Sequence, residues 1–505
     1  MKLEKKYGLF TAICMVVGTV VGSGVFFKAQ NILNLTEGNM SLGILAWIIG
    51  GLIMVACACT FAVLATKYEK VNGVVDYAEV LVGKKYAYFI GWFLAVIYIP
   101  CIASVLAWVS ARYFGELFGW SLTSSNVMVI AGLFLVASYS LNALAPKLAG
   151  KFQVSCTVIK MIPLLLMALV GIIYGLIKTT VTYEVINGEV VKVGQTQMQI
   201  LIENFKNVGG SGAKILFGSI VATAFAYEGW IVATSINAEL KNAKRNLPIA
   251  LFIGALIIVG IYIAYYLGVA GGATIEVLQV GGAPYAFKQI FGDIFGTILT
   301  VFVVISCLGT LNGLMLAATR GIYALSSRNM GPKPEVFNEV SENTNMPTNS
   351  SVFGLLCCAA WLAYFYGANL TASWFGVFSF DSSELPIVTI YAMYIPIFVM
   401  MILRQRKSFG VFKGIVLPAI AIACCIFMVI AAIYAHGISV LYYFIVFLVI
   451  MAFGGLFLLT NKADESGEKV TFGALMKKKV STLTGGLILA AILIVFVVYV
   501  LFVVL

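Results

Sequence analysis

The sequence predicts an all-α polytopic membrane protein, and three observations support this fold class. Of the 505 residues, 61% are hydrophobic and only 10% are charged. The apolar residues gather in about thirteen segments, each long enough to cross a bilayer as a helix. Basic clusters recur at alternate connections between these segments. A soluble protein of this length carries far more charge, so the composition excludes a soluble fold.

The expected membrane segments follow one another with mostly short connections. Their approximate bounds are 8–36, 43–66, 86–114, 125–145, 152–177, 211–238, 247–271, 292–326, 350–367, 372–403, 414–435, 438–460 and 482–505. The ten cysteines are scattered through these segments without metal-ligand spacing. We therefore predict no metal site and no cofactor.

The placement of the basic residues predicts the orientation of the chain. Lysine and arginine clusters fall on the side that is cytoplasmic when the N-terminus is inside, as the positive-inside rule requires. These clusters are Lys2/Lys5/Lys6, Lys84/Lys85, Lys241/Lys244/Arg245, Arg404/Arg406/Lys407 and Lys477–Lys479. The net charge of +11 therefore indicates topology rather than nucleic-acid binding. We expect a multi-pass protein of the cell (inner) membrane, with the C-terminus outside if there are thirteen helices.

The first segment contains an unusual stretch, Val16–Phe27, with glycines at 18, 22 and 24. Glycine costs about 1 kcal/mol relative to alanine inside a helix. One interpretation is an opened helix, whose free N–H and C=O groups hold a carboxylate and an ammonium. The other is a small-residue packing face, in which Gly18 and Gly22 contact a neighbouring helix. This stretch alone does not decide between them.

The sixth segment repeats the anomaly, because Glu228 and Gly229 interrupt an apolar span at a similar depth. Two interrupted segments at matching positions of two halves are typical of a transporter with inverted repeats. We therefore favour opened helices and expect a 5+5 inverted-repeat fold with discontinuous helices 1 and 6. The expected units are 1–178 (helices 1–5), 179–207 (an outer loop with a β-hairpin at Asn187-Gly188), 208–405 (helices 6–10) and 406–505 (helices 11–13).

Four ionisable residues stand in or beside apolar segments. Lys160 lies about ten residues into segment five, and an ionisable group at that depth is a functional hypothesis, although a lysine can also reach back to the interface. Asp381 and Glu384 lie within segment ten, or nearer its outer end if the predicted boundary is misplaced. His436 falls in a tight outer turn and is expected to be a surface residue.

Four motifs are specific enough to name a family. They are G-S-G-V-F at 22–26, F-A-Y-E-G-W at 225–230, A-E-L-K-N-A-K-R-N-L-P at 238–248 and R-G-I-Y-A-L-S-S-R-N-M-G-P at 320–332. Together they resemble permeases of the amino acid–polyamine–organocation (APC) superfamily, in particular its L-type amino acid transporter-like branch. The resemblance covers roughly residues 5–460 and includes the surface helix expected between segments two and three.

The resemblance implies a role for each residue of the two interruptions. The Ser23 and Gly24 amides would bind the substrate carboxylate, and Lys160 would replace a sodium ion. Phe225 would be an aromatic gate, and Trp230 would shape the site. Carbonyls near the substrate would receive its amino group. The full set of implied substrate-binding residues is Val20, Gly22, Ser23, Gly24, Phe225, Ala226, Glu228, Gly229 and Trp230.

The sequence departs from the family pattern at several positions. Val74 stands where the first cytoplasmic loop usually has a second glycine, and Ala243 replaces a usual proline. Glu228 is larger and more acidic than the residue common in this branch. The thirteenth helix is an addition. The outer turn at 115–126 contains no cysteine, so we expect no disulfide-linked heavy chain.

The leading hypothesis is sodium-independent transport of a neutral L-amino acid by alternating access, through exchange or proton coupling. Lys160 and Glu228 are the candidate coupling residues. Alternatively, Glu228 recognises a cationic amino acid or polyamine. A nutrient sensor that binds without transporting is a further alternative. An enzyme is not expected, because one histidine and scattered cysteines provide no catalytic set.

Overall fold

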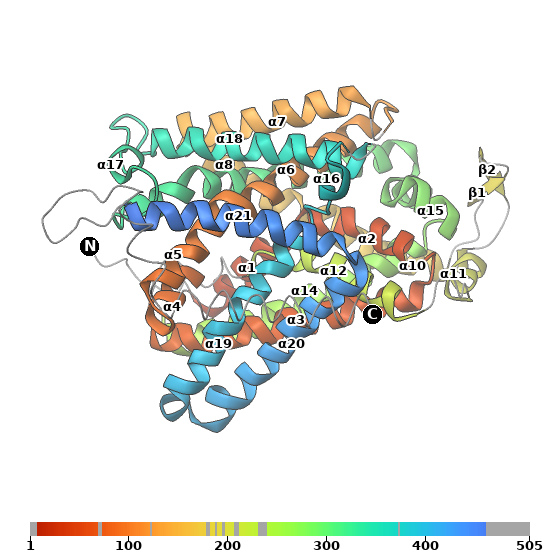
Figure 1. The fold of residues 1–505 in the computed structure, drawn as a ribbon. Helices are drawn as coiled ribbons and strands as arrows, with labels where there is room; N and C mark the ends of the chain where they lie inside the picture. Colours follow the sequence, from red (N-terminus) through yellow and green to blue (C-terminus); the bar gives the residue numbers. More distant parts are fainter. Residues whose placement is uncertain are drawn as a thin grey trace, which may run out of the picture.

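The computed structural model describes residues 8–68, 73–121, 124–177, 182–186, 189–193, 197–206, 212–230, 240–371 and 374–460. Long helices that lie side by side dominate this part of the chain (Figure 1). The predicted all-α class is therefore confirmed, apart from one small hairpin.

The first five spans are helical, and two of them contain π-helical turns. Their elements are α1 (Leu9–Val20), α2 (Ser23–Leu35), α3 (Met40–Lys67), α4 (Val74–Leu81), α5 (Lys84–Phe93), η1 (Leu94–Tyr98), α6 (Ile99–Glu116), α7 (Ser125–Leu144), α8 (Pro146–Ile159), α9 (Met161–Leu166), η2 (Met167–Gly171) and α10 (Ile172–Ile177). The short helix α4 is the predicted helix of the first long connection. Asn39 caps α3 by accepting a hydrogen bond from the Leu42 amide, which satisfies one free amide of the first turn.

The predicted β-hairpin is present. Strands β1 (Thr182–Ile186) and β2 (Glu189–Val193) pair antiparallel, with Ile186 opposite Glu189. The Asn187-Gly188 turn itself lies outside the described residues. Helix α11 (Gln197–Lys206) follows the hairpin.

The second half of the described chain is again helical. Its elements are α12 (Ala213–Tyr227), α14 (Ala243–Ala270), α15 (Ile275–Gly281), α16 (Ala283–Ser326), α17 (Pro334–Phe337), α18 (Thr348–Phe365), η4 (Tyr366–Leu370), η5 (Gly376–Phe378), α19 (Leu385–Val411), η6 (Phe412–Val416), α20 (Leu417–His436) and α21 (Ser439–Thr460). Gly410, with φ +73°, breaks the helical path near the end of α19, and α19 and α20 pack against each other as a hairpin.

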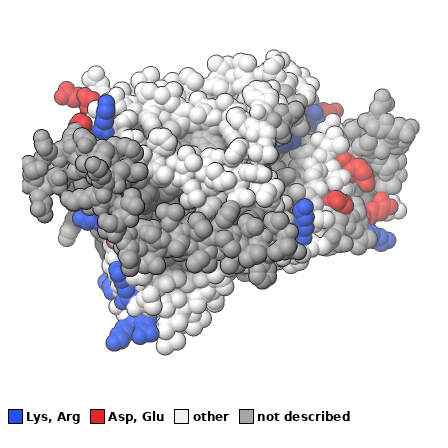
Figure 2. Space-filling model, viewed as in Figure 1, with Lys and Arg blue, Asp and Glu red and all other residues white. Residues whose placement is uncertain are grey.

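Within the described residues, nine helices are long and apolar enough to cross a membrane, or ten if α1 and α2 count as one bent span. Helix α12 is apolar but shorter. The predicted thirteenth segment, 482–505, lies outside the described residues, so the total of thirteen remains a prediction. On the visible face, described charged side chains gather toward the two ends of the molecule, with a largely uncharged surface between them (Figure 2).

The predicted start of segment ten, at residue 372, is wrong. Helix α19 begins at Leu385, and the residues before it form the 3-10 turn η5 and further turns. Asp381 and Glu384 therefore precede the helix instead of lying inside it. The physical reason is that Asp381 accepts hydrogen bonds from the Ser383 and Glu384 amides, which stabilises a turn instead of a continuing helix.

Eight of the described helices pack in two groups. Helices α1, α3, α12 and α14 contact one another, and α6, α7, α16 and α18 form a second set of mutual contacts. Counted as membrane spans, the first group contains spans 1, 2, 6 and 7, and the second contains spans 3, 4, 8 and 9. Each group thus takes corresponding members from the two halves of the chain, which is the arrangement that an internal repeat favours.

Candidate functional site

The first predicted interruption is real. Helix α1 ends at Val20, and α2 begins at Ser23 with its axis turned by 49°. Val21 and Gly22 between them have extended backbone. No side chain caps the N-terminus of α2, whose first amides have no partner within the helix. The break therefore offers a positive helix end at one side and the carbonyls of α1 at the other.

The second interruption follows α12, which ends at Tyr227. Glu228 is extended, and Gly229 has φ +106°, a conformation that glycine adopts without strain. The Tyr227 hydroxyl donates to the Trp47 carbonyl of α3 at 2.8 Å, and the two rings meet edge to face. This contact fixes the end of α12. Residues 231–239 lie outside the described part of the chain.

The two interruptions cross in direct contact. A Cβ atom placed on Gly24 would lie 2.6 Å from the Ala226 Cα atom, and one placed on Gly229 would lie 2.6 Å from the Thr19 carbonyl oxygen. Real Cβ atoms do not come this close to a backbone, so only glycine fits at either position. The sequence patterns at 22–26 and 225–230 thus meet in the structure.

Tyr262 of α14 joins the two breaks from one side. Its hydroxyl lies 3.2 Å from the Val20 carbonyl oxygen and 3.0 Å from that of Ala226, and the residue is fully buried. The hydroxyl occupies part of the hydrogen-bonding capacity of both carbonyls, and it holds the last turns of α1 and α12 at a fixed separation. Tyr262 was not predicted as a site residue, because nothing local in its sequence distinguishes it from other aromatic residues in apolar helices.

Glu228 lies at the centre of the second break. Its Oε2 atom accepts from the Gly229 amide at 3.3 Å, and the Tyr98 hydroxyl interacts with the carboxylate, whose buried Oε1 atom makes no close hydrogen bond to a described residue. Trp230, which is 1% exposed, packs its ring against Phe61 and Tyr394. A buried carboxylate oxygen without a close donor is costly. It therefore marks a place where a bound donor would be stabilised.

Lys160 is buried between α8 and α9, and its ammonium donates to the Gly18 carbonyl of α1 at 2.5 Å. The alternative interpretation, in which this lysine reaches back to the membrane interface, is therefore wrong. The ammonium reaches the last turn of α1, two residues before the break at Val20. Next to the break, Thr310 of α16 packs against Gly22. Helices α1, α8 and α16, which belong to spans 1, 5 and 8, thus meet here.

An aromatic layer lies over the first turn of α2. The Phe225 and Phe27 rings meet edge to face at 6.1 Å between centroids, and Phe27 also contacts Trp108 of α6. The Lys28 ammonium lies 5.3 Å from both phenylalanine ring centroids, within reach of a cation–π interaction. Phe225 is thus placed where an aromatic residue could cover the crossing, although its role as a gate stays a prediction.

An ion cluster that the local sequence patterns did not predict lies beside this layer. The Lys28 ammonium lies 2.5 Å from Glu384 Oε1, and His436 Nε2 lies 3.1 Å from Glu384 Oε2. His436 is therefore not the surface residue that we expected, because it is partly buried against a carboxylate. Like Lys160, Lys28 is a lysine inside an apolar segment, and this feature could have identified it from the sequence.

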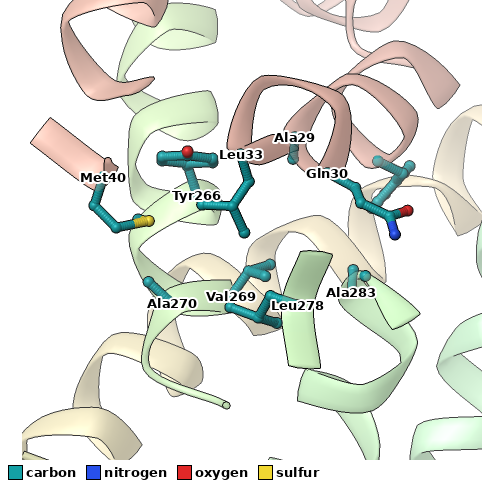
Figure 3. A pocket seen from close by; sticks show the side chains of 11 residues that line it. Ala29, Gln30, Leu33, Met40, Tyr266, Val269, Ala270, Leu278 and Ala283 are labelled. Carbon is teal, nitrogen blue, oxygen red and sulfur yellow. The ribbon is translucent and has the colours of Figure 1, made fainter. Parts of the chain in front are cut away.

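A separate pocket lies behind α2, away from the crossing (Figure 3). Phe26, Gln30 and Leu33 of α2 line it together with Tyr266 of α14 and Leu278 of α15. Its lining is mainly apolar, and none of the predicted substrate-binding residues contributes to it. Across the described ranges, no group of three or more histidine, cysteine or acidic residues is placed to hold a metal ion.

Comparison with known proteins gives a consistent assignment. The family model for amino acid permeases matches residues 7–454. The serine/threonine exchanger SteT of Bacillus subtilis is 30% identical over 438 residues, which cover 84% of this chain and 90% of SteT. The b(0,+)-type amino acid transporter 1 of Mus musculus is 25% identical over 427 residues, or 79% of this chain and 81% of the relative. The human cystine/glutamate transporter is 24% identical over 355 residues, which cover 68% of this chain and 65% of that transporter.

These relatives are transporters and exchangers of amino acids, and the family is one of transporters and not of enzymes. The match extends over both interruptions, the helices that pack on them and the ion cluster. The resemblance inferred from the four motifs is thereby confirmed: the chain belongs to the amino acid permease family of the APC superfamily.

Proposed function

We propose that this chain is a sodium-independent secondary transporter of neutral L-amino acids that works by alternating access. The observation that carries the proposal is the crossing of the two interruptions at Gly24 and Gly229. There, the uncapped N-terminus of α2 stands next to the carbonyls of α1 and α12. A free amino acid carries a carboxylate and an ammonium close together, so these opposite helix ends match its constant part without a charged side chain.

The assignment of individual roles follows from this match. The Ser23 and Gly24 amides would bind the carboxylate at the start of α2. The carbonyls at Val20, Phe225, Ala226 and Glu228 would receive the ammonium. Lys160 would act as a fixed cation beside α1, in the position that a sodium ion occupies in other transporters with this fold, and its 2.5 Å contact with the Gly18 carbonyl supports that role. Phe225 and Trp230 would cover and shape the site.

The proposal also includes the orientation of the chain in the membrane and its internal repeat. The basic clusters favour a cytoplasmic N-terminus in the cell membrane, which makes the end with Leu35 and His436 the outer side. The two packing groups favour an inverted repeat of residues 1–178 and 208–405. The expected absence of a disulfide-linked heavy chain belongs to the same proposal. Exchange is favoured as the transport mode, because SteT is an exchanger of serine and threonine.

The test is uptake of labelled amino acids into proteoliposomes without sodium. Vesicles would be empty, preloaded with unlabelled substrate, or given an inward proton gradient. Uptake that depends on preloading indicates an exchanger, and uptake driven by the proton gradient indicates a symporter in which Lys160 or Glu228 titrates. Saturable binding without uptake would support a sensor instead. If no amino acid binds or enters under any condition, the proposal is wrong.

A second candidate substrate class rests on Glu228. Its buried Oε1 atom, which makes no close hydrogen bond to a described residue, would suit the cationic side chain of an amino acid or polyamine. The Glu228→Gln variant separates the possibilities. Selective loss of cationic substrates would support recognition by Glu228, and loss of proton dependence would support coupling. Unchanged transport of every substrate would assign Glu228 to structure alone.

A further inference from the structure

Three residues far apart in the sequence form a buried ion cluster at the Leu35 end of the molecule. Lys28 belongs to α2, Glu384 lies in the turn before α19, and His436 ends α20. The Glu384 carboxylate is shared, since Oε1 faces Lys28 at 2.5 Å and Oε2 faces His436 at 3.1 Å. Lys28 and Glu384 are 1% and 4% exposed. We name Lys28, Glu384 and His436 the ion cluster.

Stability does not explain the ion cluster. Removing two charges from water often costs as much as their mutual attraction returns, and apolar side chains of similar size would pack at least as well. Charged groups within a membrane protein's apolar spans are therefore a functional hypothesis by default. The position of the cluster is informative, because Lys28 connects α2, the helix that starts at the proposed carboxylate site, to two helices outside both packing groups.

Among the groups around Glu384, His436 is the one whose charge can change near neutral pH. Asp381 is engaged by the Ser383 amide and hydroxyl and by the Glu384 amide. The Tyr364 hydroxyl of α18 bonds to the Phe380 carbonyl, and the Tyr443 hydroxyl of α21 bonds to Thr389. Arg112 of α6 lies across the Phe27 ring, 6.0 Å from its centroid. Histidine is the side chain among these that ordinarily gains or loses a proton between pH 5 and 8.

Proton binding to His436 is linked to the position of α2, because α2 carries Lys28. With Lys28 in place, its positive charge repels a proton on His436 and already neutralises Glu384. With α2 moved away, Glu384 loses Lys28, and a protonated His436 becomes its only counter-charge. The proton is therefore held more tightly when α2 is displaced. By reciprocity, proton binding favours displacement of α2.

We propose that Glu384 and His436 form a proton-binding site at the outer gate, in which a proton replaces Lys28 as the counter-charge of Glu384 when α2 swings open. This inference rests on the proposed function, because it requires α2 to move during alternating access. External acidity then stabilises the outward-open state and increases the apparent affinity for external substrate. The ligand of the site is a proton from the outer solution, and its release accompanies closure of α2.

The experiment measures exchange in preloaded proteoliposomes, at internal pH 7.5 and external pH 7.5, 6.5 and 5.5, with membrane potential clamped. For the wild type, we expect the external KM to fall about 5-fold or more from pH 7.5 to 5.5, a typical size for coupling between two sites. In His436→Gln, which keeps a donor for Glu384 but binds no proton, the KM should not depend on pH. Tyr434→Phe, on the lipid-exposed side of α20, should behave as the wild type.

The sequence provides an independent readout, because His436 is the only histidine in the chain. Protein labelled with ¹⁵N-histidine gives the NMR signal of this residue alone, and this signal should change protonation state between pH 5 and 8. No change in that interval, or an unaltered pH dependence in His436→Gln, overturns the inference. The NMR titration uses wild-type protein, so it decides the question even if the variant fails to fold. Exchange that persists at every pH without a change in KM refutes the proton site and leaves the proposed function standing, whereas absent uptake refutes the proposed function itself.

Discussion

At the crossing of the two interruptions, the backbone of α12 leaves no room for a side chain at position 24. The Gly24→Ala variant tests whether this crossing is the substrate site. The added Cβ would lie 2.6 Å from the Ala226 Cα atom and 3.2 Å from its Cβ atom. These atoms belong to the backbone and to a methyl group next to it, so no flexible side chain can turn aside. Either α2 or the end of α12 must shift, and overpacking of this kind costs about 1–3 kcal/mol.

We expect this cost to appear in substrate binding, because the shift separates the amides of α2 from the carbonyls of α12. If the full cost falls on binding, the affinity decreases about 5- to 150-fold. The matched control is Gly218→Ala, an identical change in the same helix as Ala226. There the new Cβ would lie 3.7 Å from the Ala435 Cβ atom, an ordinary van der Waals contact.

The assay combines equilibrium binding of the best-transported amino acid to purified protein, uptake into proteoliposomes, and thermal unfolding. Gly218→Ala should bind and transport as the wild type does, with an equal or higher Tm, because alanine favours the helix by about 1 kcal/mol. Gly24→Ala should retain a cooperative unfolding transition while its affinity decreases. If both variants bind and transport equally well, the crossing is not the substrate site.

Three further predictions follow from other contacts. Lys160→Met leaves the Gly18 carbonyl without its donor at a cost of about 1–3 kcal/mol, so exchange should decrease at least about 5-fold; wild-type rates would contradict the role of the ammonium. Tyr262→Phe removes a bond of about 0.5–1.5 kcal/mol, so substrate Kd should rise about 2- to 13-fold, and an unchanged Kd would show that the hydroxyl does not fix the breaks. Arg328→Ala removes an ion pair with Asp76 at 2.6 Å that joins the end of α16 to α4. Because the Asp76 side chain is only 9% exposed, loss of Arg328 should lower the Tm and slow exchange. An unchanged Tm and an unchanged rate would show that the pair contributes to neither stability nor transport.

Local patterns predicted the parts of the site that depend on the backbone. Glycines at 22 and 229 disfavour a continuous helix, and the structure breaks at those two places. The pattern also indicated that the two segments correspond. It did not reveal why glycine is required, since the contact between Gly24 and Ala226 joins residues about two hundred positions apart and depends on how two helices cross.

The ion cluster shows the limit of local reasoning more clearly. Lys28 and Glu384 are separated by 356 positions, and His436 lies 52 positions beyond Glu384. Glu384 and His436 each had an ordinary interpretation, an acid near a segment boundary and a histidine in a turn, and Lys28 was not singled out. Only the tertiary fold shows that one carboxylate contacts both Lys28 and His436, because pairing between distant segments leaves no periodic signal.

The contacts around the first break explain how one half of a bent span can move while the other remains fixed. Helix α1 packs along α14 and is held at its end by the hydroxyl of Tyr262 and the ammonium of Lys160. Helix α2 packs its apolar face against α12 and α15 and is also joined to its outer neighbours by polar links: Lys28 to Glu384, and Gln30 to Arg112 and to a carbonyl of α15. Polar links can exchange their partners for water at a small net cost, whereas apolar packing cannot. Under the proposed function, we therefore expect α1 to be the anchored half of the span and α2 to be the half that moves.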